Sequence, residues 1–450
     1  MKKSRKIYLF LSVLLVISVF AACNSTKAPS SSSTQQASSA PADISKSAEA
    51  VTSAPAQEPV TISYFSYFSD YRDELQVALE TFTEKNPTIK VDFSVAPVSD
   101  YPQLLKTQVA SGDGPDVFSL WPGLSYVTYY AKNGHLMDLS NEEWVKNIVP
   151  GAMSTITYED KIYAQPIRSS VVGITYNKDI YKNLSIEIPQ TWEEFLDVCQ
   201  KIKDSGITPL ALALKTDWPG QFLPIYAFPC NILYSQNPQW DKQLFDGEVT
   251  FSDSDYKKCF EMFMDIDARG YFNETPLGVS YDQAVASFVN QETAMSAGVD
   301  SFLTLTLTKD PDFEVGMYPV PAPAGFQTTV PVGGNYCNVI YAKTKNADAA
   351  KSLLDYFSTQ EAYDQVTVFR TSISLLSNIE VDVHPEIINN MVPAINKSSY
   401  SFTNLEWVPG IQEGFQKGYQ ELFAGVKTIE QMLSDVDKIA ETNIANFKES

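Results

Sequence analysis

Apolar residues recur with strand and helix spacing between residues 60 and 120. Residues 70–85, for example, place Leu75, Ala78, Leu79 and Phe82 on one helix face. Residues 89–95 instead alternate between apolar and polar, which is the period of a strand. The predicted elements, in order, are a strand at 60–64, a helix at 70–85, a strand at 89–95, a helix at 101–110 and a strand at 116–120. This β-α-β-α-β order predicts a doubly wound unit with a parallel sheet.

Two loops of this unit are rich in aromatic and polar residues. Residues 65–70 follow the first predicted strand, and residues 121–126 follow the third. Because ligands of parallel sheets bind beyond the carboxyl ends of the strands, these loops form the expected binding edge.

The same patterns continue to the end of the chain. A hairpin is predicted at 158–166, strands at 171–176 and 207–214, and helices at 192–205, 348–358, 359–369, 408–424 and 428–447. Thr191 followed by Glu194 predicts a capping box at the start of the helix at 192–205. The same helix carries Trp192 in its apolar stripe, so this tryptophan is expected in the core.

The composition suits a folded body of two or three domains. The 450 residues are 44% hydrophobic and 12% aromatic, and the net charge is −21. This acidity disfavours nucleic acid and anionic surfaces as partners and leaves neutral or cationic ligands open.

The N-terminal residues predict export and a lipid anchor. Residues 1–22 combine a basic start with an apolar run that is too short for an ordinary membrane span, which is typical of a signal peptide. The run ends in Phe20-Ala-Ala-Cys23, which resembles a bacterial lipobox, so Cys23 is the expected lipidation site. An ordinary signal peptide that leaves a free thiol is the alternative. Residues 23–58 are rich in Ser, Ala, Thr, Gln and Pro and are expected to form a disordered tether.

A set of short motifs in a fixed order carries a family resemblance. The motifs are Phe82-Thr-Glu-Lys-Asn-Pro87, Gly114-Pro-Asp-Val-Phe118, Tyr163-Ala-Gln-Pro166, Tyr176-Asn-Lys-Asp179, Pro189-Gln-Thr-Trp-Glu-Glu-Phe195, Gly206-Ile-Thr-Pro-Leu210 and the segment 288–298. From about residue 60 to the C-terminus the chain resembles the extracellular solute-binding proteins of bacterial ABC transporters, in the carbohydrate-binding family that includes maltose-binding protein. Each motif alone is weak, and their order behind a lipobox and tether is what makes the match specific.

The resemblance implies a two-lobed α/β fold of the periplasmic-binding-protein type II class. Each lobe would be a mostly parallel sheet flanked by helices, and hinge strands would join the lobes. Residues 59–168 and 297–343 are expected in lobe 1, and residues 169–296 and 344–450 in lobe 2. The implied function is capture of a carbohydrate, expected to be an oligosaccharide, and its delivery to an ABC permease by a lipid-anchored monomer on the outer face of the cell membrane.

Aromatic faces and planar polar groups are what a sugar site needs. The candidate ligand-binding residues are Tyr67, Asp70, Trp121, Arg168, Asp217, Trp218, Asp300, Gly334, Asn335 and Tyr336. Several of these rest on the resemblance, such as Asp217-Trp218 after a strand and the Gly333-Gly-Asn-Tyr336 segment. Each also has a structural interpretation. The tryptophans could lie in the core, Gly333-Gly334 could form a turn, and Arg168 could pair with a structural carboxylate.

Enzymatic activity is not expected, and no metal or cofactor is predicted. The sequence has only His135 and His384, neither in a metal-ligand spacing, and it contains no nucleophile elbow or phosphate loop. Two alternatives stay open: a receptor for a polyamine or other small solute, which the acidic charge would suit, and a secreted carbohydrate-active hydrolase. Whether Cys199, Cys230, Cys259 and Cys337 form disulfides is open as well.

Overall fold

The computed structural model describes residues 59–449. The predicted signal peptide, the lipidation site Cys23 and the tether lie outside the described residues. Within the described range, no helix combines the length and the apolar character that crossing a membrane would require.

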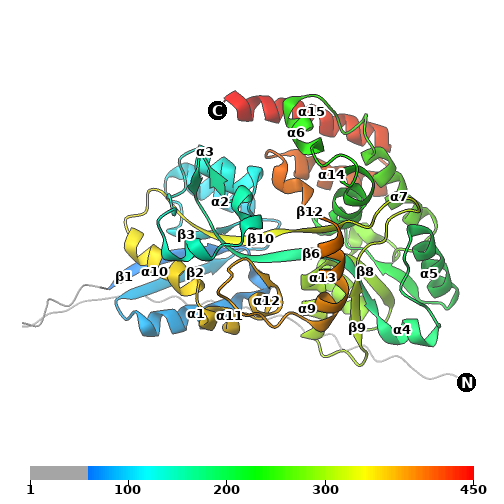
Figure 1. Cartoon of the computed structure of the whole chain (residues 1–450), viewed down its shortest axis with the longest axis horizontal. Helices are drawn as coiled ribbons and strands as arrows, with labels where there is room; N and C mark the ends of the chain where they lie inside the picture. The colour runs from blue at the N-terminus through cyan, green and yellow to red at the C-terminus, as the bar shows by residue number, and fades with distance from the viewer. Residues whose placement is uncertain (1–58, 450) are drawn as a thin grey trace, which may run out of the picture. The chain divides into compact units, whose positions relative to one another are not determined.

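The first lobe is the predicted doubly wound unit (Figure 1). Its elements are β1 (Val60–Ser66), α1 (Arg72–Lys85), β2 (Ile89–Val95), α2 (Tyr101–Ser111) and β3 (Val117–Leu120). Strand β1 pairs in parallel with both β2 and β3, which confirms the parallel sheet. This pairing places the residues that follow β1 and β3 at the same edge of the sheet.

The second lobe has a mixed sheet rather than a mostly parallel one. Strand β6 (Gln165–Asn177) pairs antiparallel with β8 (Thr293–Val299) and with β9 (Val315–Tyr318), and β7 (Thr208–Ala211) pairs in parallel with β8. The sequence could predict strands here but not their directions, because residue periodicity is the same in parallel and antiparallel strands.

The remaining elements surround these two sheets or connect them. They are α3 (Tyr129–Lys132), β4 (Thr157–Tyr158), β5 (Lys161–Ile162), α4 (Lys178–Asn183), α5 (Trp192–Asp204), α6 (Trp240–Asp246), α7 (Tyr256–Ala268), α8 (Tyr281–Val289), α9 (Asp300–Leu307), β10 (Val330–Ile340), α10 (Ala347–Phe357), α11 (Gln360–Gln365), α12 (Thr367–Thr371), β11 (Ile373–Ser374), α13 (Val392–Lys397), β12 (Ser399–Tyr400), α14 (Ile411–Phe423) and α15 (Ile429–Glu449). Strands β4 and β5 form the predicted hairpin, and Glu159 and Asp160 at its turn have the positive φ angles that a tight hairpin turn requires.

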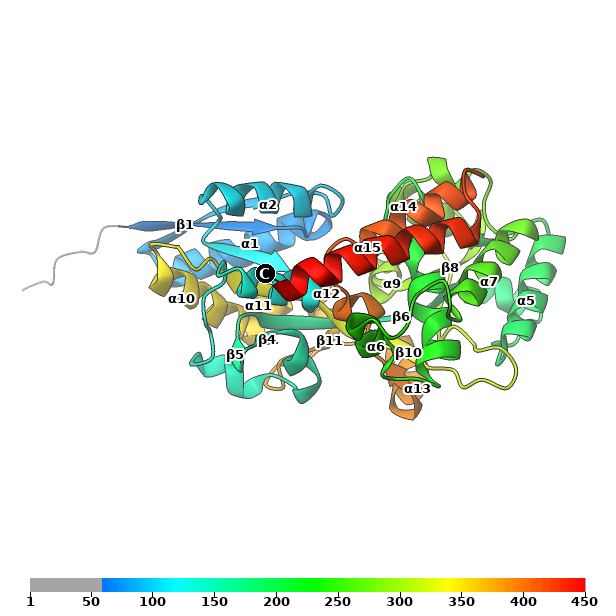
Figure 2. The same cartoon turned by 90° about the horizontal axis from the view of Figure 1, so that it is seen from above.

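Two long strands join the lobes. Strands β6 and β10 lie side by side and antiparallel; β10 also pairs with β3 of the first lobe, and β6 continues into the sheet of the second. A third connection follows α12, where β11 pairs with β6 at Ser169 and Arg168. The view in Figure 2 shows these strands running between the two halves.

Two hydrophobic clusters form the cores of the lobes. The first-lobe cluster is built on Tyr64, Leu79 and Phe118, and the second-lobe cluster on Phe195, Phe260 and Phe415. All six side chains are at most 2% exposed.

Two groups of elements pack in a different lobe from the one that the sequence predicted. Helices α10–α12, which were predicted in lobe 2, pack into the first core through Leu353, Leu354 and Phe369. Strand β8 and helix α9 lie against β6 in the second lobe, although residues 297–343 were predicted in lobe 1. An apolar helix face shows that a helix packs on something, but it does not show which of two sheets it covers.

Helix α5 begins at the predicted cap with one difference. The Thr191 side chain accepts a hydrogen bond from the Glu194 backbone N–H at 3.2 Å, as expected for an N-cap. The Glu194 carboxylate, however, accepts from the backbone N–H of Gln190 at 2.6 Å. The helix-core position predicted for Trp192 is confirmed, since this side chain is 5% exposed in the second-lobe cluster.

The four cysteines within the described range are buried free thiols. Burial raises the pKa of Cys199, Cys230, Cys259 and Cys337. These thiols therefore behave as small core side chains, and the two lobes are held by packing rather than by disulfides among them.

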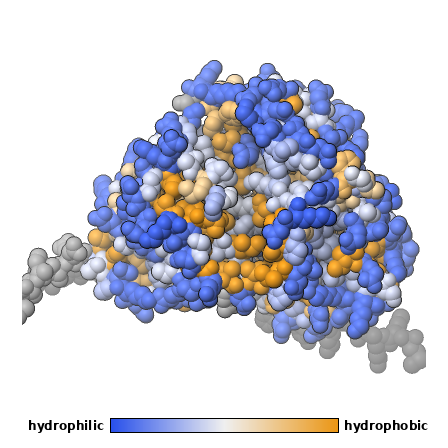
Figure 3. Space-filling model, viewed as in Figure 1, coloured by the Kyte–Doolittle hydropathy of each residue, from blue (hydrophilic) through white to orange (hydrophobic). Residues whose placement is uncertain are grey.

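Hydrophilic side chains cover most of the surface seen in Figure 3, and apolar side chains gather in small patches towards its middle. The large apolar side chains that are exposed, such as Val77, Leu277 and Val426, belong to elements far apart in the chain. Scattered exposure of this kind is normal for a folded protein.

Candidate ligand-binding site

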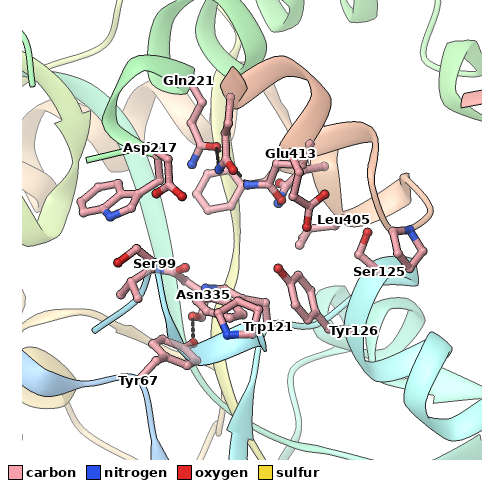
Figure 4. Close-up of a pocket in the computed structure, with 18 of the residues that line it drawn as sticks. Tyr67, Ser99, Trp121, Ser125, Tyr126, Asp217, Gln221, Asn335, Leu405 and Glu413 are labelled. Atoms are coloured by element: carbon pink, nitrogen blue, oxygen red, sulfur yellow. Dashed lines mark hydrogen bonds between the residues drawn. The ribbon is translucent and has the colours of Figure 1, made fainter. Parts of the chain in front are cut away.

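A cavity of about 900 Å³ lies between the two lobes, and residues of both line it. This volume is within the usual range for small-molecule sites. Figure 4 shows side chains of the first lobe, such as Tyr67 and Trp121, facing Asp217 and Gln221 of the second across the open space.

The first-lobe wall carries a stacked aromatic pair. The rings of Tyr67 and Trp121 are 3.9 Å apart between centroids and 9° from parallel, and Tyr126 lies against Trp121 at 5.0 Å. Tyr67 follows β1 and Trp121 follows β3, so the parallel pairing of these strands brings the two rings together. The Tyr67 hydroxyl donates a hydrogen bond to the Asn335 carbonyl at 2.6 Å, and burial raises the pKa of Tyr67.

The second-lobe wall carries a separate aromatic group. Trp218 lies 4.5 Å from Tyr281 and 5.7 Å from Phe222 between ring centroids. Trp218 precedes a short 3-10 helix, η5 (Pro219–Gln221), and Tyr281 is the first residue of α8. The cavity therefore has apolar ring faces on both sides.

Acidic and amide groups lie between these aromatic walls. Asp70 and Asp217 line the cavity, and neither forms an ion pair within 4.0 Å with any side chain that the structure describes. Burial raises the pKa of both carboxyl groups, and the nearby Asp282 raises that of Asp70 further. A ligand that donates hydrogen bonds would stabilise the charged form of each carboxylate.

Further polar groups come from the second lobe. The Gln221 side-chain carbonyl accepts a hydrogen bond from the Gln412 amide at 2.9 Å, and Glu413 caps α14 by accepting from the Gly410 N–H at 3.0 Å. Amide and carboxylate groups held in this way present fixed acceptors and donors to the cavity.

Eight of the ten predicted ligand-binding residues line the cavity. They are Tyr67, Asp70, Trp121, Arg168, Asp217, Trp218, Gly334 and Asn335. At Gly334 a Cβ would lie 3.0 Å from the Pro122 side chain, so glycine allows β10 to approach the loop after β3 closely.

Asp300 and Tyr336 do not line the cavity. Asp300 is 2% exposed and accepts from Arg168 at 3.0 Å, so its carboxylate is already paired. The Tyr336 ring lies in the first core, stacked on Phe68 at 4.2 Å with its hydroxyl bonded to that of Tyr64. The pairing of β10 with β6 shifts register on both sides of Tyr336, and this irregularity breaks the alternation that would have turned the side chain towards the cavity.

Several lining residues were not predicted. They include Tyr126, Gln221, Phe222, Tyr281, Leu405, Glu413 and Asn443. Tyr126 lies in the aromatic loop at 121–126 and could have been included. The others come from segments whose sequence indicates only helix or core, and tertiary packing brings them to the cavity.

Nothing in the described part of the chain resembles a metal centre. Across residues 59–449 no three His, Cys, Asp or Glu side chains come together in an arrangement that could hold a metal ion.

Comparison with known proteins identifies the family. The sequence profile described as bacterial extracellular solute-binding protein matches residues 67–364, well over half of the chain. The chain belongs to this family. Its match begins at Tyr67, the first aromatic residue of the cavity wall, and extends through both lobes.

Individual relatives agree with this family. The chain is 26% identical over 364 residues to the multiple sugar-binding protein of Streptococcus mutans, covering 80% of both chains. It is 22% identical over 346 residues to the melibiose/raffinose/stachyose-binding protein MelE of Bacillus subtilis, covering 75% of this chain and 79% of the relative. A sugar transporter of Bacillus licheniformis, solved in complex with stachyose, superposes with a TM-score of 0.73 at 22% identity and covers 84% of this chain and 98% of its own. This superposition supports the two-lobed solute-binding fold.

Proposed function

We propose that this protein is a lipid-anchored extracellular receptor that captures an oligosaccharide between its lobes and delivers it to an ABC permease. The observation that carries the proposal is the pair of aromatic walls, Tyr67 with Trp121 and Trp218 with Tyr281, on opposite sides of one cavity. Sugar rings have apolar C–H faces that pack on such aromatic rings, and their hydroxyls need the acceptors that Asp70 and Asp217 provide.

The names of the relatives support a carbohydrate ligand. Two of them are named for sugars, and one solved structure holds stachyose. Aromatic walls on both lobes suit a ligand longer than one ring, since each wall can hold its own sugar unit.

In this proposal the chain binds its ligand without chemical change. Transport energy would come from a partner ATPase, and Cys23 would carry the lipid that keeps the receptor at the membrane.

A Cys23→Ser chain is then expected in the soluble fraction after cell fractionation, whereas the unaltered chain is expected with membranes.

Isothermal titration of the purified chain with sugars tests the main proposal. The panel contains stachyose, raffinose, chito-oligosaccharides and monosaccharides, with spermidine added because Asp70 and Asp217 lack a cationic partner among the described residues. We expect one oligosaccharide class to bind with one ligand per chain and to be recovered intact. Binding of spermidine alone, or release of new reducing ends from the sugar, would overturn the proposal.

Alanine variants locate the binding surface. Trp121→Ala and Trp218→Ala are each expected to weaken binding roughly tenfold or more, since buried aromatic anchors carry a large share of binding energy. Tyr158→Ala, at a hairpin residue that does not line the cavity, is the matched control and is expected to bind normally.

A further inference from the structure

A buried ion pair lies at the junction of the two lobes. The Arg168 guanidinium donates to the Asp300 carboxylate at 3.0 Å, and the two residues are only 1% and 2% exposed. Burying two charges costs free energy that their attraction recovers only in part, so stability alone is a weak reason for such a pair. Its location suggests another role.

Hydrogen bonds around the ion pair connect two of the three segments that run between the lobes. Arg168 and Ser170 belong to β6, and the Arg168 guanidinium donates to the Ser170 hydroxyl at 2.8 Å. Ser372, just before β11, accepts from the guanidinium at 2.9 Å and donates to the Asp300 carboxylate at 3.2 Å.

The third segment joins through Asn335. This residue lies on β10, and its side-chain amide donates to the Ser170 hydroxyl at 3.1 Å. We call Arg168, Ser170, Asp300, Asn335 and Ser372 the hinge cluster. It bonds all three crossing segments to one another.

The hinge cluster is also tied to the second lobe and to the ligand cavity. Asp300 begins α9 and accepts the Val171 backbone N–H at 3.3 Å. On the cavity side, the Tyr67 hydroxyl donates to the Asn335 carbonyl at 2.6 Å. The stacked ring of the first wall is therefore connected by hydrogen bonds, through Asn335 and Ser170, to the ion pair.

The geometry of guanidinium explains why the cluster favours one lobe arrangement. Its donors form a rigid planar fork, so the bonds to Ser170, Ser372 and Asp300 are satisfied together only at one relative placement of these segments. Rotating the lobes moves these segments against one another and leaves buried polar groups without partners, which is costly. The cost defines a discrete position for the lobes.

We propose that Arg168 and Asp300 are positioning residues that fix the angle of lobe closure, rather than ligand contacts. The proposal rests on the proposed function, since it takes the lobes to close on a ligand. The sequence predicted both residues as ligand contacts, and this proposal assigns them a structural role in lobe closure instead.

Spin-label distance measurements between the lobes test this proposal. Labels at Val77→Cys in the first lobe and Val426→Cys in the second use exposed positions, while the four native cysteines of the body are buried; Cys23→Ser removes the fifth. The test variant is Arg168→Met with Asp300→Leu, because an apolar pair of similar size avoids leaving one buried charge alone. The matched control is Lys351→Met with Glu142→Gln, which removes a 2.6 Å ion pair inside the first lobe.

The unaltered hinge is expected to give a narrow distance distribution with stachyose bound. In the test variant we expect the distribution of distances between the two labels to be at least twice as broad as in the parent, both with and without stachyose. We also expect the variant to bind stachyose at least fivefold more weakly than the parent does. The control pair is expected to match the parent in both measurements. Arg168→Lys keeps a charge beside the cavity but loses the fork, so it is expected to behave like the test variant.

Two results would overturn the proposal. One is a distribution in the test variant as narrow as the parent's. The other is weakened stachyose binding with an unchanged distribution at saturation, which would make Arg168 a ligand contact. If the parent chain itself binds no sugar, the function proposed above fails, while the width measured without ligand still decides the role of the hinge cluster.

Discussion

Asp241, on α6, is a carboxylate buried in the second lobe among neutral hydrogen-bond donors. The Tyr234 hydroxyl and the Trp407 indole donate to one oxygen at 2.6 and 3.0 Å, and the Tyr400 hydroxyl approaches the other at 3.4 Å. Burial raises the pKa of Asp241 to about 7, although the three hydrogen bonds oppose this shift. Trp407 lies two residues from Leu405 of the cavity lining, so this carboxyl group supports the segment that reaches the ligand site.

The raised pKa of Asp241 predicts a loss of stability as the pH rises. Between about pH 4 and pH 7 the folded chain holds a proton on Asp241 that the unfolded chain has released. Raising the pH through this interval therefore lowers the stability, by at most on the order of 4 kcal/mol, since each pKa unit is worth about 1.4 kcal/mol.

Thermal unfolding of Asp241→Asn across this pH range isolates the effect. Asparagine is neutral at every pH and keeps an oxygen for Tyr234 and Trp407. We expect the variant to unfold close to the parent near pH 4 and above it at pH 8. A difference between the two midpoints that does not change with pH would contradict the assignment.

Helix α15 illustrates what a single element adds to the site. Its buried residues Met432, Leu433 and Val436 pack in the second core, and its last two turns contribute Asn443 and Phe447 to the cavity lining. Figures 1 and 2 show the helix extending from the second lobe towards the first. Lys132, at the end of α3 in the first lobe, lies 4.5 Å above the Phe447 ring and donates to the Phe447 carbonyl.

The Lys132 contact predicts slower release of ligand. A cation at a helix C-terminus and over an aromatic ring gains roughly 0.5–1 kcal/mol from each interaction. Losing both interactions in Lys132→Met is therefore expected to speed ligand dissociation roughly five- to thirtyfold in stopped-flow experiments. The control is Lys258→Met, which removes a lysine 4.9 Å from the Phe326 ring within the second lobe, and should leave dissociation unchanged. Equal rates in the Lys132 variant and the parent would show that α15 does not hold the cavity closed.

At the scale of the whole molecule, the lobes also touch beside the cavity. Gly123 has a φ of +95°, and a Cβ there would lie 2.3 Å from the Leu405 carbonyl oxygen. The Ser125 hydroxyl donates to the Trp407 carbonyl at 2.7 Å in the same region. Leu405 and Trp407 belong to the second core, so glycine is what allows the two backbones to meet.

Gly123→Ala is expected to force the lobes apart at this contact. Gly112→Ala is the matched control, because Gly112 has a similar φ of +88° but open space where a Cβ would lie. Both variants carry the strain of a left-handed residue, about 1–2 kcal/mol. Only Gly123→Ala should also increase the radius of gyration in solution scattering and weaken ligand binding. Identical behaviour of the two variants would exclude a role for the Gly123 contact in lobe closure.

The binding walls were predictable to different extents. Tyr67 and Trp121 could be found from sequence because they follow neighbouring parallel strands, and the doubly wound order is visible in the apolar periodicity. Tyr281 and Glu413 could not be found in this way. Each lies in the first turn of a helix in a separate part of the chain, and only packing on the second lobe brings it to the cavity.

Arg168 and Asp300 show the limit most clearly. Both were expected to contact ligand, and the structure pairs them with each other over 132 positions of sequence. Arg168 lines the cavity as well, whereas Asp300 does not. Charge and position along the chain indicate that such residues need a partner, but they do not indicate whether that partner is a ligand or another residue.

The sequence by itself determined the local elements: the order of strands and helices in the first lobe, the Thr191 cap and the aromatic loops at 65–70 and 121–126. These depend on residues near one another in the chain, whose spacing and capping chemistry act locally. Tertiary structure alone decided the strand directions of the second lobe, the core on which α10–α12 pack, and the turning of Tyr336 away from the cavity. These depend on contacts between distant segments, and the period of a helix or strand carries no information about which distant surface its apolar face will meet.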